Sequence, residues 1–507
     1  MFYENAMSKF LKIKNKSFLV IAFAVSAIYP LLIKEEVLRS RTLWLFFLLV
    51  IAKNHKYFKA FVIFSLLISG LYGVFGMSFG LPNLAIYESL IDTNFRESME
   101  FMGEIPYKNW ITVLVFFVLS YFYVKWMPRR KVVFGRNLFF YLVIFFAIFV
   151  NSWPFKLFNA SFSLPAQYKK EKEFLMNSLN QQDTWAVTPI ADAKKYENYV
   201  VVIGESMRKD YMSAYGYMHN TTPFLNQANG VFIDGALSVG PNTIASLQKT
   251  LQIAPNGIQG EVLPYNNAVT LAKKAGLETY WISNQGYMGE YDSSVSAVAL
   301  RADHKVFFKK GEWSSANVDD EEVLTHFQKK LIENNPQKRR RIFFLHLMGS
   351  HPRACDRLHH FENNFKIGYG KQVDCYLASI AKTDDIIRRI VQLLSSKGSY
   401  SLIYFADHGL SVTEHHIKVD GELKNSYEVP LMMLSSDDVQ RIFIKKRISQ
   451  IHFLDLLSGW LGVNNNYSKK NYSFSSLERD EELDEGLVFD FKEVKSIDGL
   501  KEQQALK

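Results

Sequence analysis

The sequence predicts an α/β domain with a mostly parallel sheet flanked by helices, which follows an all-α membrane domain of five spans. Two contrasts along the 507 residues carry this prediction. Residues 1–155 hold 17 lysines and arginines against 8 aspartates and glutamates, together with 23 of the 41 phenylalanines. Residues 156–507 hold 42 basic and 42 acidic residues. A basic surplus confined to the apolar third argues against nucleic-acid binding, which requires a basic face on a folded domain.

Five apolar stretches within residues 1–155 predict five membrane-spanning helices, because a span needs about 20 mostly apolar residues. The second stretch is short for a span. The alternative is a set of buried core helices, but a soluble core of this size cannot hide five such stretches. The stretches are 17–33, 42–52, 60–77, 110–124 and 137–152.

The charges that flank these stretches predict their orientation. Four lysines precede the first span, and the loops 53–59 and 125–136 carry three and five basic residues without an acid. The loop 78–109 has two basic residues against five acids. The positive-inside rule therefore places the N-terminus and both basic loops in the cytoplasm, and five spans place everything after Trp153 outside it. The first stretch does not read as a cleaved signal peptide, because no small-residue cleavage site follows it.

The remaining chain divides into a connector at 156–196, a folded domain at 197–475 and an acidic tail at 476–507, which is expected to be solvated. Within the domain, short apolar runs alternate with helical patterns, which is typical of a mostly parallel sheet covered on both faces. Ligands of such sheets bind beyond the carboxyl ends of the strands. The strand runs are 199–205, 277–283, 341–347, 401–407 and 429–435, and the helical patterns are 265–276, 320–334 and 373–396.

The only two cysteines of the sequence, Cys355 and Cys375, both follow the predicted spans. An even pair in an oxidising compartment favours one disulfide, here closing a loop between residues 20 positions apart. The alternative is two buried thiols.

Polar side chains collect where the predicted strands end. Glu205 ends the first strand run, Asp407 and His408 end the fourth, and the third leads through His346 to His351. Two carboxylates and an imidazole that converge on one sheet edge make a nitrogen and oxygen site of the kind that Zn²⁺ accepts. An Asp-His pair at a single strand end is more often structural, so the metal hypothesis depends on this convergence.

Several of these segments together resemble a known family. They resemble the alkaline-phosphatase-like sulfatase/transferase superfamily, and more closely the inner-membrane phosphoethanolamine transferases of Gram-negative bacteria. The five-span N-terminal architecture matches as well, so the resemblance covers most of the chain. The segments are VVIGESMRKDYMSAYGYMHNTTPFL (201–225), GPNTIASL (240–247), LHLMGSH (345–351), CYLASIAKTDD (375–385) and FADHGLS (405–411).

The resemblance implies a zinc site and a nucleophile. Glu205, Asp407 and His408 match the zinc ligands of the family. Thr243 matches its nucleophile and fourth ligand. Two alternatives remain open from the residues alone: Thr243 is a favoured residue type for a helix N-cap ahead of IASLQKTL, and Ser206, next to Glu205, competes as the nucleophile.

The resemblance also implies substrate contacts. His351 and either His415 or His416 match histidines that hold the transferred phosphoryl group or a second metal, whereas His346 is expected to be structural. The loop 89–97 resembles the extracytoplasmic loop that lines the lipid site. A lysine that is usual near the substrate has no match in 283–294. The loop residues that match are Thr93 and Glu97, with Ser89 standing where an asparagine is usual.

The implied reaction transfers phosphoethanolamine from phosphatidylethanolamine to an envelope glycolipid, such as lipid A or the lipopolysaccharide core, or to a periplasmic glucan. One tightly bound Zn²⁺, with a second possible, would activate Thr243, which would carry the group covalently. The chain would be a monomer of the bacterial inner membrane with its catalytic domain in the periplasm.

Three other functions compete with this interpretation. A sulfatase or phosphodiesterase on the same fold is one, but a formylglycine sulfatase needs a cysteine or serine in a C/S-x-P-x-R context, and neither cysteine lies in one. A glycerol-phosphate transferase that uses the same threonine is the second. The third is a membrane-anchored binding protein with a decayed site, which the intact set of site residues disfavours.

Overall fold

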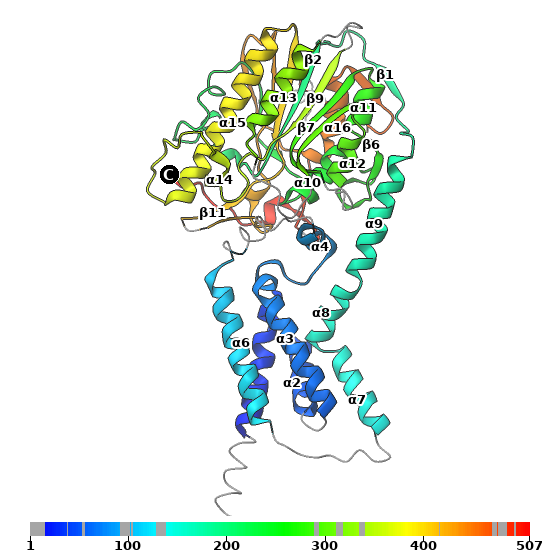
Figure 1. The fold of residues 1–507 in the computed structure, drawn as a ribbon, viewed down its shortest axis with the longest axis vertical. Coiled ribbons are helices and arrows are strands. Elements are labelled where there is room, and N and C mark those ends of the chain that lie inside the picture. The colour runs from blue at the N-terminus through cyan, green and yellow to red at the C-terminus, as the bar shows by residue number, and fades with distance from the viewer. Residues whose placement is uncertain are drawn as a thin grey trace, which may run out of the picture. The chain divides into compact units, whose positions relative to one another are not determined.

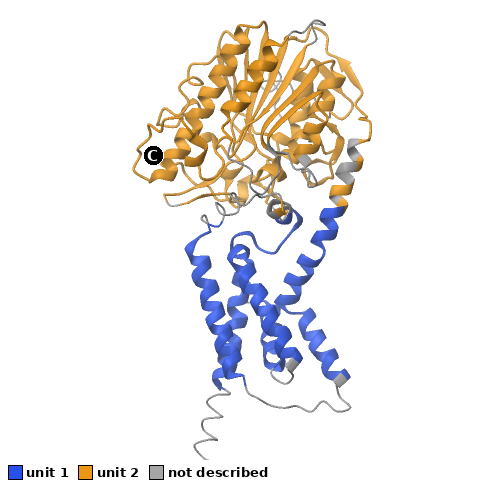
Figure 2. Cartoon of the chain, viewed as in Figure 1, with its two compact units in different colours: residues 1–88, 101–169 blue, residues 89–100, 170–507 orange. Residues whose placement is uncertain are grey.

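The computed structural model divides the chain into two compact units, residues 1–88 with 101–169 and residues 89–100 with 170–507 (Figure 2). Each unit is described by itself. The structure describes residues 16–37, 39–52, 56–91, 102, 105–127, 138–287, 294–310, 318–333, 340–414, 416–468, 474, 484–490 and 493–507.

The first unit is built from apolar helices (Figure 1). Among the described residues, three helices are long and apolar enough to cross a membrane, at Lys16–Ile33, Tyr57–Phe79 and Tyr107–Trp126. A fourth candidate is the pair Phe139–Val150 and Trp153–Lys170, which is bent by 75° at its break, and Ser40–Ala52 is a shorter apolar helix. By length and composition, three or four of the five predicted spans are therefore supported. The elements are η1 (Tyr29–Ile33), α2 (Ser40–Ala52), α3 (Lys56–Phe79), α4 (Leu84–Ile91), α6 (Tyr107–Trp126), α7 (Leu138–Val150), α8 (Trp153–Phe162) and α9 (Leu164–Leu179).

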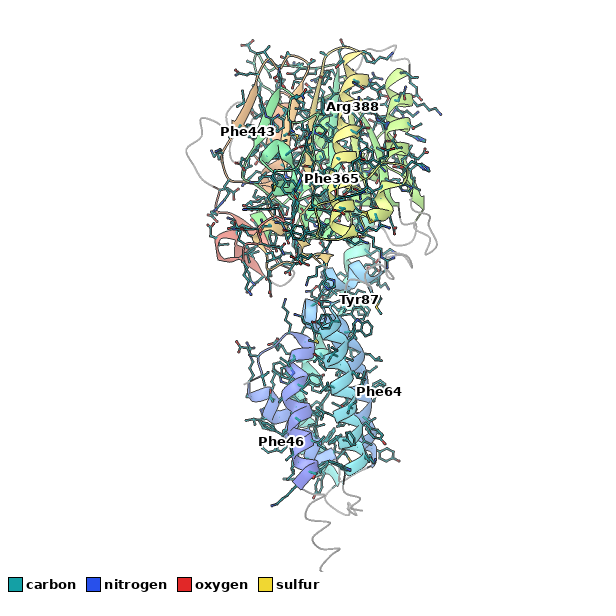
Figure 3. All side chains as sticks on the ribbon, turned by 90° about the vertical axis from the view of Figure 1, so that its left-hand side faces the viewer. Phe46, Phe64, Tyr87, Phe365, Arg388 and Phe443 are labelled. Carbon is teal, nitrogen blue, oxygen red and sulfur yellow. A yellow bond between two sulfur atoms is a disulfide. The ribbon has the colours of Figure 1, made fainter. Side chains whose placement is uncertain are left out.

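Two buried polar side chains of this helical unit donate hydrogen bonds to partners within the unit. Tyr123 donates its hydroxyl to the Leu49 carbonyl at 2.8 Å, and the Trp153 indole N–H donates to the Thr42 hydroxyl at 3.1 Å. Large apolar side chains are exposed on its outer surface, among them Phe64, which is 54% exposed and is labelled in Figure 3. Internal hydrogen bonding combined with an apolar exterior is what a lipid environment requires. The described helices of this unit therefore have the length and composition of membrane-spanning helices.

The second unit is organised around an eight-stranded sheet. All of its strands run parallel to one another except β13, which is antiparallel to both of its neighbours. The predicted mostly parallel sheet is thus confirmed, with one reversed strand. The strand order is β14 (Arg441–Ile444), β3 (Gly230–Ile233), β13 (Leu431–Ser435), β10 (Tyr400–Ala406), β2 (Asn198–Gly204), β9 (Arg341–His346), β7 (Glu278–Tyr287) and β8 (His304–Lys310).

Helices cover both faces of this sheet (Figure 1). Along β2, Val200 and Val202 belong to one buried apolar cluster, whereas Tyr199, Val201 and Ile203 belong to the other. This alternation explains why the central strands are apolar at every position. One face carries α13 (Glu321–Ile332) and α15 (Lys371–Ser395), and the other carries α10 (Thr243–Leu251), α11 (Ala268–Lys274), α12 (Ser294–Leu300) and α16 (Phe453–Trp460).

Each of the five predicted strands is present within three residues of its expected bounds, except that β7 extends to Tyr287. The expected helix at 265–276 starts only at Ala268, because Leu263–Asn267 forms β6 and Asn267 caps α11. Smaller elements complete the unit. They are α14 (Cys355–Leu358) and the strand pairs β1 (Val187–Pro189) with β16 (Val463–Asn465), β4 (Ala236–Leu237) with β15 (Ile448–Ser449), β5 (Gln252–Ile253) with β6, β11 (Ser411–Val412) with β12 (Ile417–Lys418) and β17 (Leu487–Phe489) with β18 (Val494–Ser496).

The last part of the chain differs from the solvated tail expected from the sequence. Val488 and Ile497 are buried with Leu237 and Tyr427 in a small apolar cluster. Residues 484–490 and 493–507 therefore belong to the folded unit, whereas 475–483, which hold most of the acidic run, lie outside the described residues.

Candidate metal-binding active site

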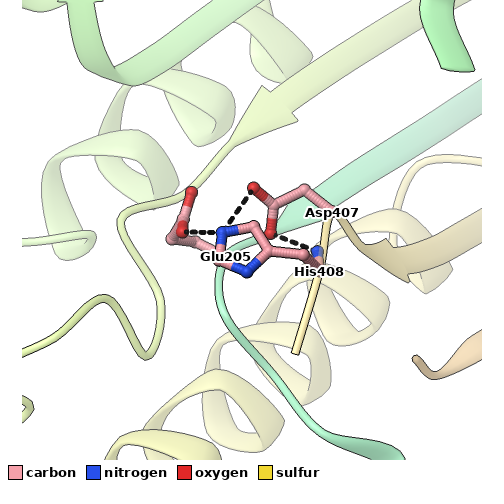
Figure 4. A group of neighbouring side chains, drawn as sticks. All are labelled: Glu205, Asp407 and His408. Carbon is pink, nitrogen blue, oxygen red and sulfur yellow. Dashed lines mark hydrogen bonds and ion pairs between the residues drawn. The ribbon is translucent and has the colours of Figure 1, made fainter. Parts of the chain in front are cut away.

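The adjacent strands β2 and β10 bring two carboxylates and an imidazole together at their carboxyl ends. Gly204 and Ala406 are register partners, so Glu205 and Asp407 leave the sheet side by side. Both carboxylates and His408 are buried. One ligand atom from each residue lies within 4.8 Å of the others, and Figure 4 shows the three side chains facing one another. Within the described part of the chain this is the only such group.

One carboxylate oxygen of this group receives no hydrogen bond. Asp407 Oδ1 accepts the backbone N–H groups of Ser206 at 3.0 Å and His408 at 2.7 Å, whereas its Oδ2 is buried and accepts no hydrogen bond. His408 Nδ1 lies 2.8 Å from the Gly409 carbonyl, which fixes the proton on Nδ1 and directs Nε2 toward the carboxylates. Nε2 lies 3.2 Å from Glu205 Oε1 and 3.6 Å from Asp407 Oδ2. A buried acceptor without a donor is costly unless a cation compensates it.

The electrostatics of the group show the same need for positive charge. Burial and the neighbouring Glu205 carboxylate raise the pKa of Asp407 to about 8. Burial alone would lower the pKa of His408, but Asp407 and Glu205 raise it to about 9. Burial also opposes ionisation of Glu205, yet contact with His408 holds the pKa of this carboxyl well below its usual range. Two buried carboxylates so close together cannot both be charged without a compensating cation.

Thr243 is the first residue of α10, and its Oγ1 donates a hydrogen bond of 3.0 Å to Glu205 Oε2. The N-cap of this helix is Asn242, whose side chain accepts from the Ala245 N–H at 2.9 Å. The alternative of Thr243 as the N-cap is therefore wrong. Its hydroxyl is directed instead at the carboxylate group, at a helix N-terminus where an anion is stabilised.

Ser206, the competing nucleophile candidate, contacts the same group. Its backbone adopts a left-handed conformation with φ of +56°, which is uncommon outside glycine. Its Oγ donates to Glu205 Oε1 at 2.6 Å and lies 3.4 Å from His408 Nε2. Ser206 is fully buried, whereas Thr243 is only half-buried. Thr243 is thus the more accessible hydroxyl.

Two further residues form hydrogen bonds at this carboxyl edge of the sheet, and neither was predicted from the sequence. Gln285, in β7, donates its amide to Glu205 Oε2 at 2.7 Å and to the Leu347 carbonyl at 3.0 Å. Asp320, just before α13, accepts the backbone N–H groups of Met348 at 2.8 Å and Gly349 at 2.9 Å. These contacts span 28 to 80 positions along the chain, so no local pattern reveals them.

The predicted histidines take different places. His351 contributes to lowering the pKa of Glu205, and Arg357 Nη2 lies 3.4 Å from His351 Nδ1. His346 is buried, with Nδ1 at 3.3 Å from the Ser283 hydroxyl. His416 lies between β11 and β12, where its backbone N–H donates to Thr413 Oγ1 at 3.0 Å. The remaining candidates, His415, Thr93, Glu97 and the side chain of Ser89, lie outside the described residues.

Cys355 and Cys375 form a disulfide, as the sequence predicts. The bond joins the short helix α14 to the long helix α15, with Cα atoms 4.8 Å apart. It therefore fixes the segment that follows His351 to the helical layer of the domain.

The model of the sulfatase family matches residues 197–463, which include Glu205, Thr243, Asp407 and His408, and the chain belongs to that family. Within it the chain belongs to the family of phosphoethanolamine transferases that includes OpgE. It is 33% identical over 444 residues to phosphoethanolamine transferase OpgE of Escherichia coli, with 82% of each chain covered.

Two solved structures share the fold. The integral membrane lipooligosaccharide phosphoethanolamine transferase A of Neisseria meningitidis matches with a TM-score of 0.57 and 17% identity, over 84% of this chain and 89% of that one. The periplasmic domain of Escherichia coli EptC, in complex with zinc, matches with a TM-score of 0.52 and 21% identity, over 62% of this chain and 98% of that one. The first match extends beyond the sulfatase-like region into the N-terminal helices.

Proposed function

We propose that this enzyme transfers phosphoethanolamine from phosphatidylethanolamine to an envelope glycolipid, lipid A or the lipopolysaccharide core, or to a periplasmic glucan, through a covalent intermediate on Thr243. The observation that carries the proposal is the hydrogen bond of Thr243 Oγ1 to Glu205, 3.0 Å long, beside the buried Asp407 and His408. The family membership and the name of the relative OpgE support the transferred group.

Glu205, Asp407 and His408 fit a zinc ion, with Thr243 as the fourth ligand. The fit rests on the donor set of two carboxylates and one imidazole nitrogen, and on Asp407 Oδ2, which is buried without a hydrogen bond. A bound zinc ion would lower the pKa of the Thr243 hydroxyl and neutralise charge on a phosphate oxygen. The EptC domain that shares this fold is a zinc complex, which supports the same metal here.

The first chemical step follows from the position of Thr243. Its oxygen attacks the phosphorus of the donor lipid, the bond from phosphorus to the glycerol oxygen breaks, and diacylglycerol leaves with a proton. The hydroxyl proton is already directed at Glu205 Oε2. The N-terminus of α10 stabilises the anionic phosphoryl group on Thr243. Most of the catalytic effect in phosphoryl transfer comes from such positioning and charge neutralisation.

In the second step, an oxygen of the acceptor attacks the same phosphorus, the bond from phosphorus to Thr243 Oγ1 breaks, and the proton lost by the acceptor restores the threonine hydroxyl. We assign His351 and His416, with His415 as the alternative to His416, to the phosphoryl group or to a second metal. We assign Thr93, Glu97 and Ser89 to the lipid side of the site. These assignments rest on the matching motifs of the sequence.

We further propose that the apolar helices cross the bacterial inner membrane five times, with Ser40–Ala52 and Leu138–Val150 as the second and fifth spans. Five crossings and the basic cytoplasmic loops then place the catalytic unit in the periplasm. Because the donor is a membrane lipid, a membrane anchor keeps the site near its substrate. We propose that the working enzyme is a monomer.

The test is mass spectrometry of envelope glycolipids and glucans from cells with and without the protein, with the Thr243→Ala variant as control. A phosphoethanolamine increment that requires Thr243 is expected. A glycerol-phosphate increment instead would show the alternative transferase. A sulfatase that uses a cysteine-derived formylglycine is disfavoured because both cysteines are joined in the disulfide.

A further inference from the structure

The two loops that carry the proposed metal ligands are joined by a buried arginine. Arg208 lies three residues after Glu205, is fully buried, and forms a two-pronged ion pair with Asp210 at 2.6 and 2.9 Å. Its Nη1 also donates to the Leu410 carbonyl at 3.3 Å, two residues after His408. Arg208 therefore connects the loop after β2 to the loop after β10.

A segment far away in the sequence completes this connection. Gln503 lies in residues 501–506, the strap. Its Oε1 accepts from Arg208 Nη1 at 2.6 Å and from the Val412 N–H at 2.9 Å, and its backbone carbonyl accepts from Arg208 Nη2 at 2.7 Å. One side chain thus binds both ligand-bearing loops, across 295 and 91 positions of sequence.

The strap is held in place along its whole length. The Lys501 carbonyl accepts from the Lys424 N–H at 2.8 Å, and the Gln503 N–H donates to Asn425 Oδ1 at 2.7 Å. At the far end, the Leu506 N–H donates to the Tyr211 hydroxyl at 3.0 Å. These contacts keep Gln503 in position to accept the hydrogen bonds of Arg208.

The connection leads back to the ligands themselves. The hydroxyl of Tyr376 accepts from the Arg208 N–H at 3.0 Å and donates to the Ser206 carbonyl at 3.1 Å. On the other loop, Gly409 donates its N–H to the Ser426 carbonyl at 2.7 Å, and a Cβ on Gly409 would come within 2.4 Å of the Asn425 carbonyl. Little space is left for either loop to move independently of Asn425 and the strap.

We propose that Gln503 is a positioning residue that, through Arg208 and Val412, sets the distance between Glu205 and the Asp407–His408 pair and so tunes metal affinity. This inference rests on the proposed metal site. Residues that support metal ligands from behind typically change metal affinity by about 10-fold to 100-fold when they are removed. Gln503 acts through two intermediaries, so a loss near the lower limit, about tenfold, is expected.

The test uses the full-length protein, purified in detergent, with zinc affinity measured by competition with a chromogenic chelator. Gln503→Ala should weaken zinc binding about tenfold, and Gln503→Glu, which retains the acceptor, should restore most of it. Gln504→Ala, at the exposed neighbouring position, is the matched control and should bind zinc as the wild type does. The melting temperature of the metal-free protein is recorded for each variant.

Unchanged zinc affinity in Gln503→Ala, or a loss that Gln503→Glu does not restore, would overturn the proposal. A fall in melting temperature with unchanged affinity would show a purely structural strap and would overturn it as well. If Gln503→Ala does not fold, Gln503→Asn takes its place, because it shortens the side chain by one methylene. Gln503→Asn should also bind zinc more weakly than the wild type, and wild-type zinc affinity in this variant would overturn the proposal. Glu205→Gln distinguishes failure of the proposed metal site from failure of the proposed role of Gln503. If Glu205→Gln retains zinc, the proposed metal site is wrong, and the role of Gln503 is wrong with it.

Discussion

Thr243 Oγ1 and Gln285 Nε2 both donate to Glu205 Oε2, at 3.0 and 2.7 Å, while Glu205 Oε1 faces His408 Nε2. The two oxygens of one carboxylate therefore serve different partners. Oε1 lies beside the two other proposed metal ligands, Asp407 and His408, and Oε2 orients the proposed nucleophile. This division makes Glu205 the residue that connects the proposed metal site to the proposed nucleophile.

The first prediction concerns the hydroxyl of Thr243. Thr243→Ala should lower the transfer rate by at least about 10³-fold, because losing a nucleophile removes the covalent route. Thr243→Ser retains the hydroxyl and should keep part of the activity. The measurement is release of diacylglycerol from labelled phosphatidylethanolamine, together with the intact mass of the protein, which should show one added phosphoethanolamine only when a hydroxyl is present. Full activity in Thr243→Ala would contradict the mechanism.

A second prediction concerns metal removal. Chelation should abolish transfer and lower the unfolding temperature, and added zinc should restore both, since a ligand at 100 times its dissociation constant stabilises the folded state by about 2.7 kcal/mol. Asp407→Ala should show no response to zinc in the same thermal scan. Stoichiometric zinc by elemental analysis in each of Glu205→Ala, Asp407→Ala and His408→Ala would place the metal elsewhere.

The disulfide gives a third prediction, on stability. Replacing Cys355 and Cys375 together by serine opens a loop with a sequence separation of 20. The chain-entropy model predicts a loss of about 3 kcal/mol in the free energy of unfolding for a loop of this length. Thermal unfolding of the double variant and of the reduced wild type should show the same decrease. Equal stability of oxidised and reduced protein would contradict this role.

The fourth prediction is a pH dependence of stability that arises from His452. Burial alone would lower the pKa of His452, but Asp455 and Asp484 raise it to about 9. The folded state therefore binds this proton more tightly than the unfolded chain, in which histidine has a pKa of about 6.5. The stabilisation is complete below about pH 6.5 and is lost as the pH rises through about 9.

His452→Gln tests this dependence. The imidazole is about one-third exposed, so solvent screens its ion pairs. The variant should therefore lose only about 1–2 kcal/mol in the free energy of unfolding at pH 6. The gap in unfolding temperature between wild type and variant should narrow from pH 6 to pH 10. A gap that widens over this range would show that the charged imidazole does not stabilise the fold.

Much of the catalytic unit was predictable because its signals are local. The strand at Asn198–Gly204 is apolar on both faces, and Glu205 follows it directly, so one short segment indicates both a strand and a ligand. The strand Tyr400–Ala406 with Asp407 and His408 repeats this pattern. The ends of parallel strands meet at one edge, which explains why the convergence of these three side chains could be expected.

Other features could not be predicted because they depend on distant partners. The strands Gly230–Ile233 and Arg441–Ile444 are only four residues long, too short for a periodic pattern to stand out. The reversed direction of β13 depends on how its connection runs, and apolar character does not encode direction. Gln285 and Gln503 are ordinary polar residues whose roles come from contacts made across the fold.

The reversed strand β13 has a consequence for how this enzyme can diversify. Because β13 is antiparallel to β10, the chain leaves the sheet at Ala406 and re-enters it beside that residue, where the Ala406 N–H donates to the Pro430 carbonyl at 3.3 Å. The whole excursion 407–430 thus begins and ends at the edge that holds the ligands, with no crossover to the opposite edge. Insertions or deletions in its outer part can reshape the rim of the active site without altering the register of any central strand. This excursion can therefore vary in length while the central strands of the sheet keep their register.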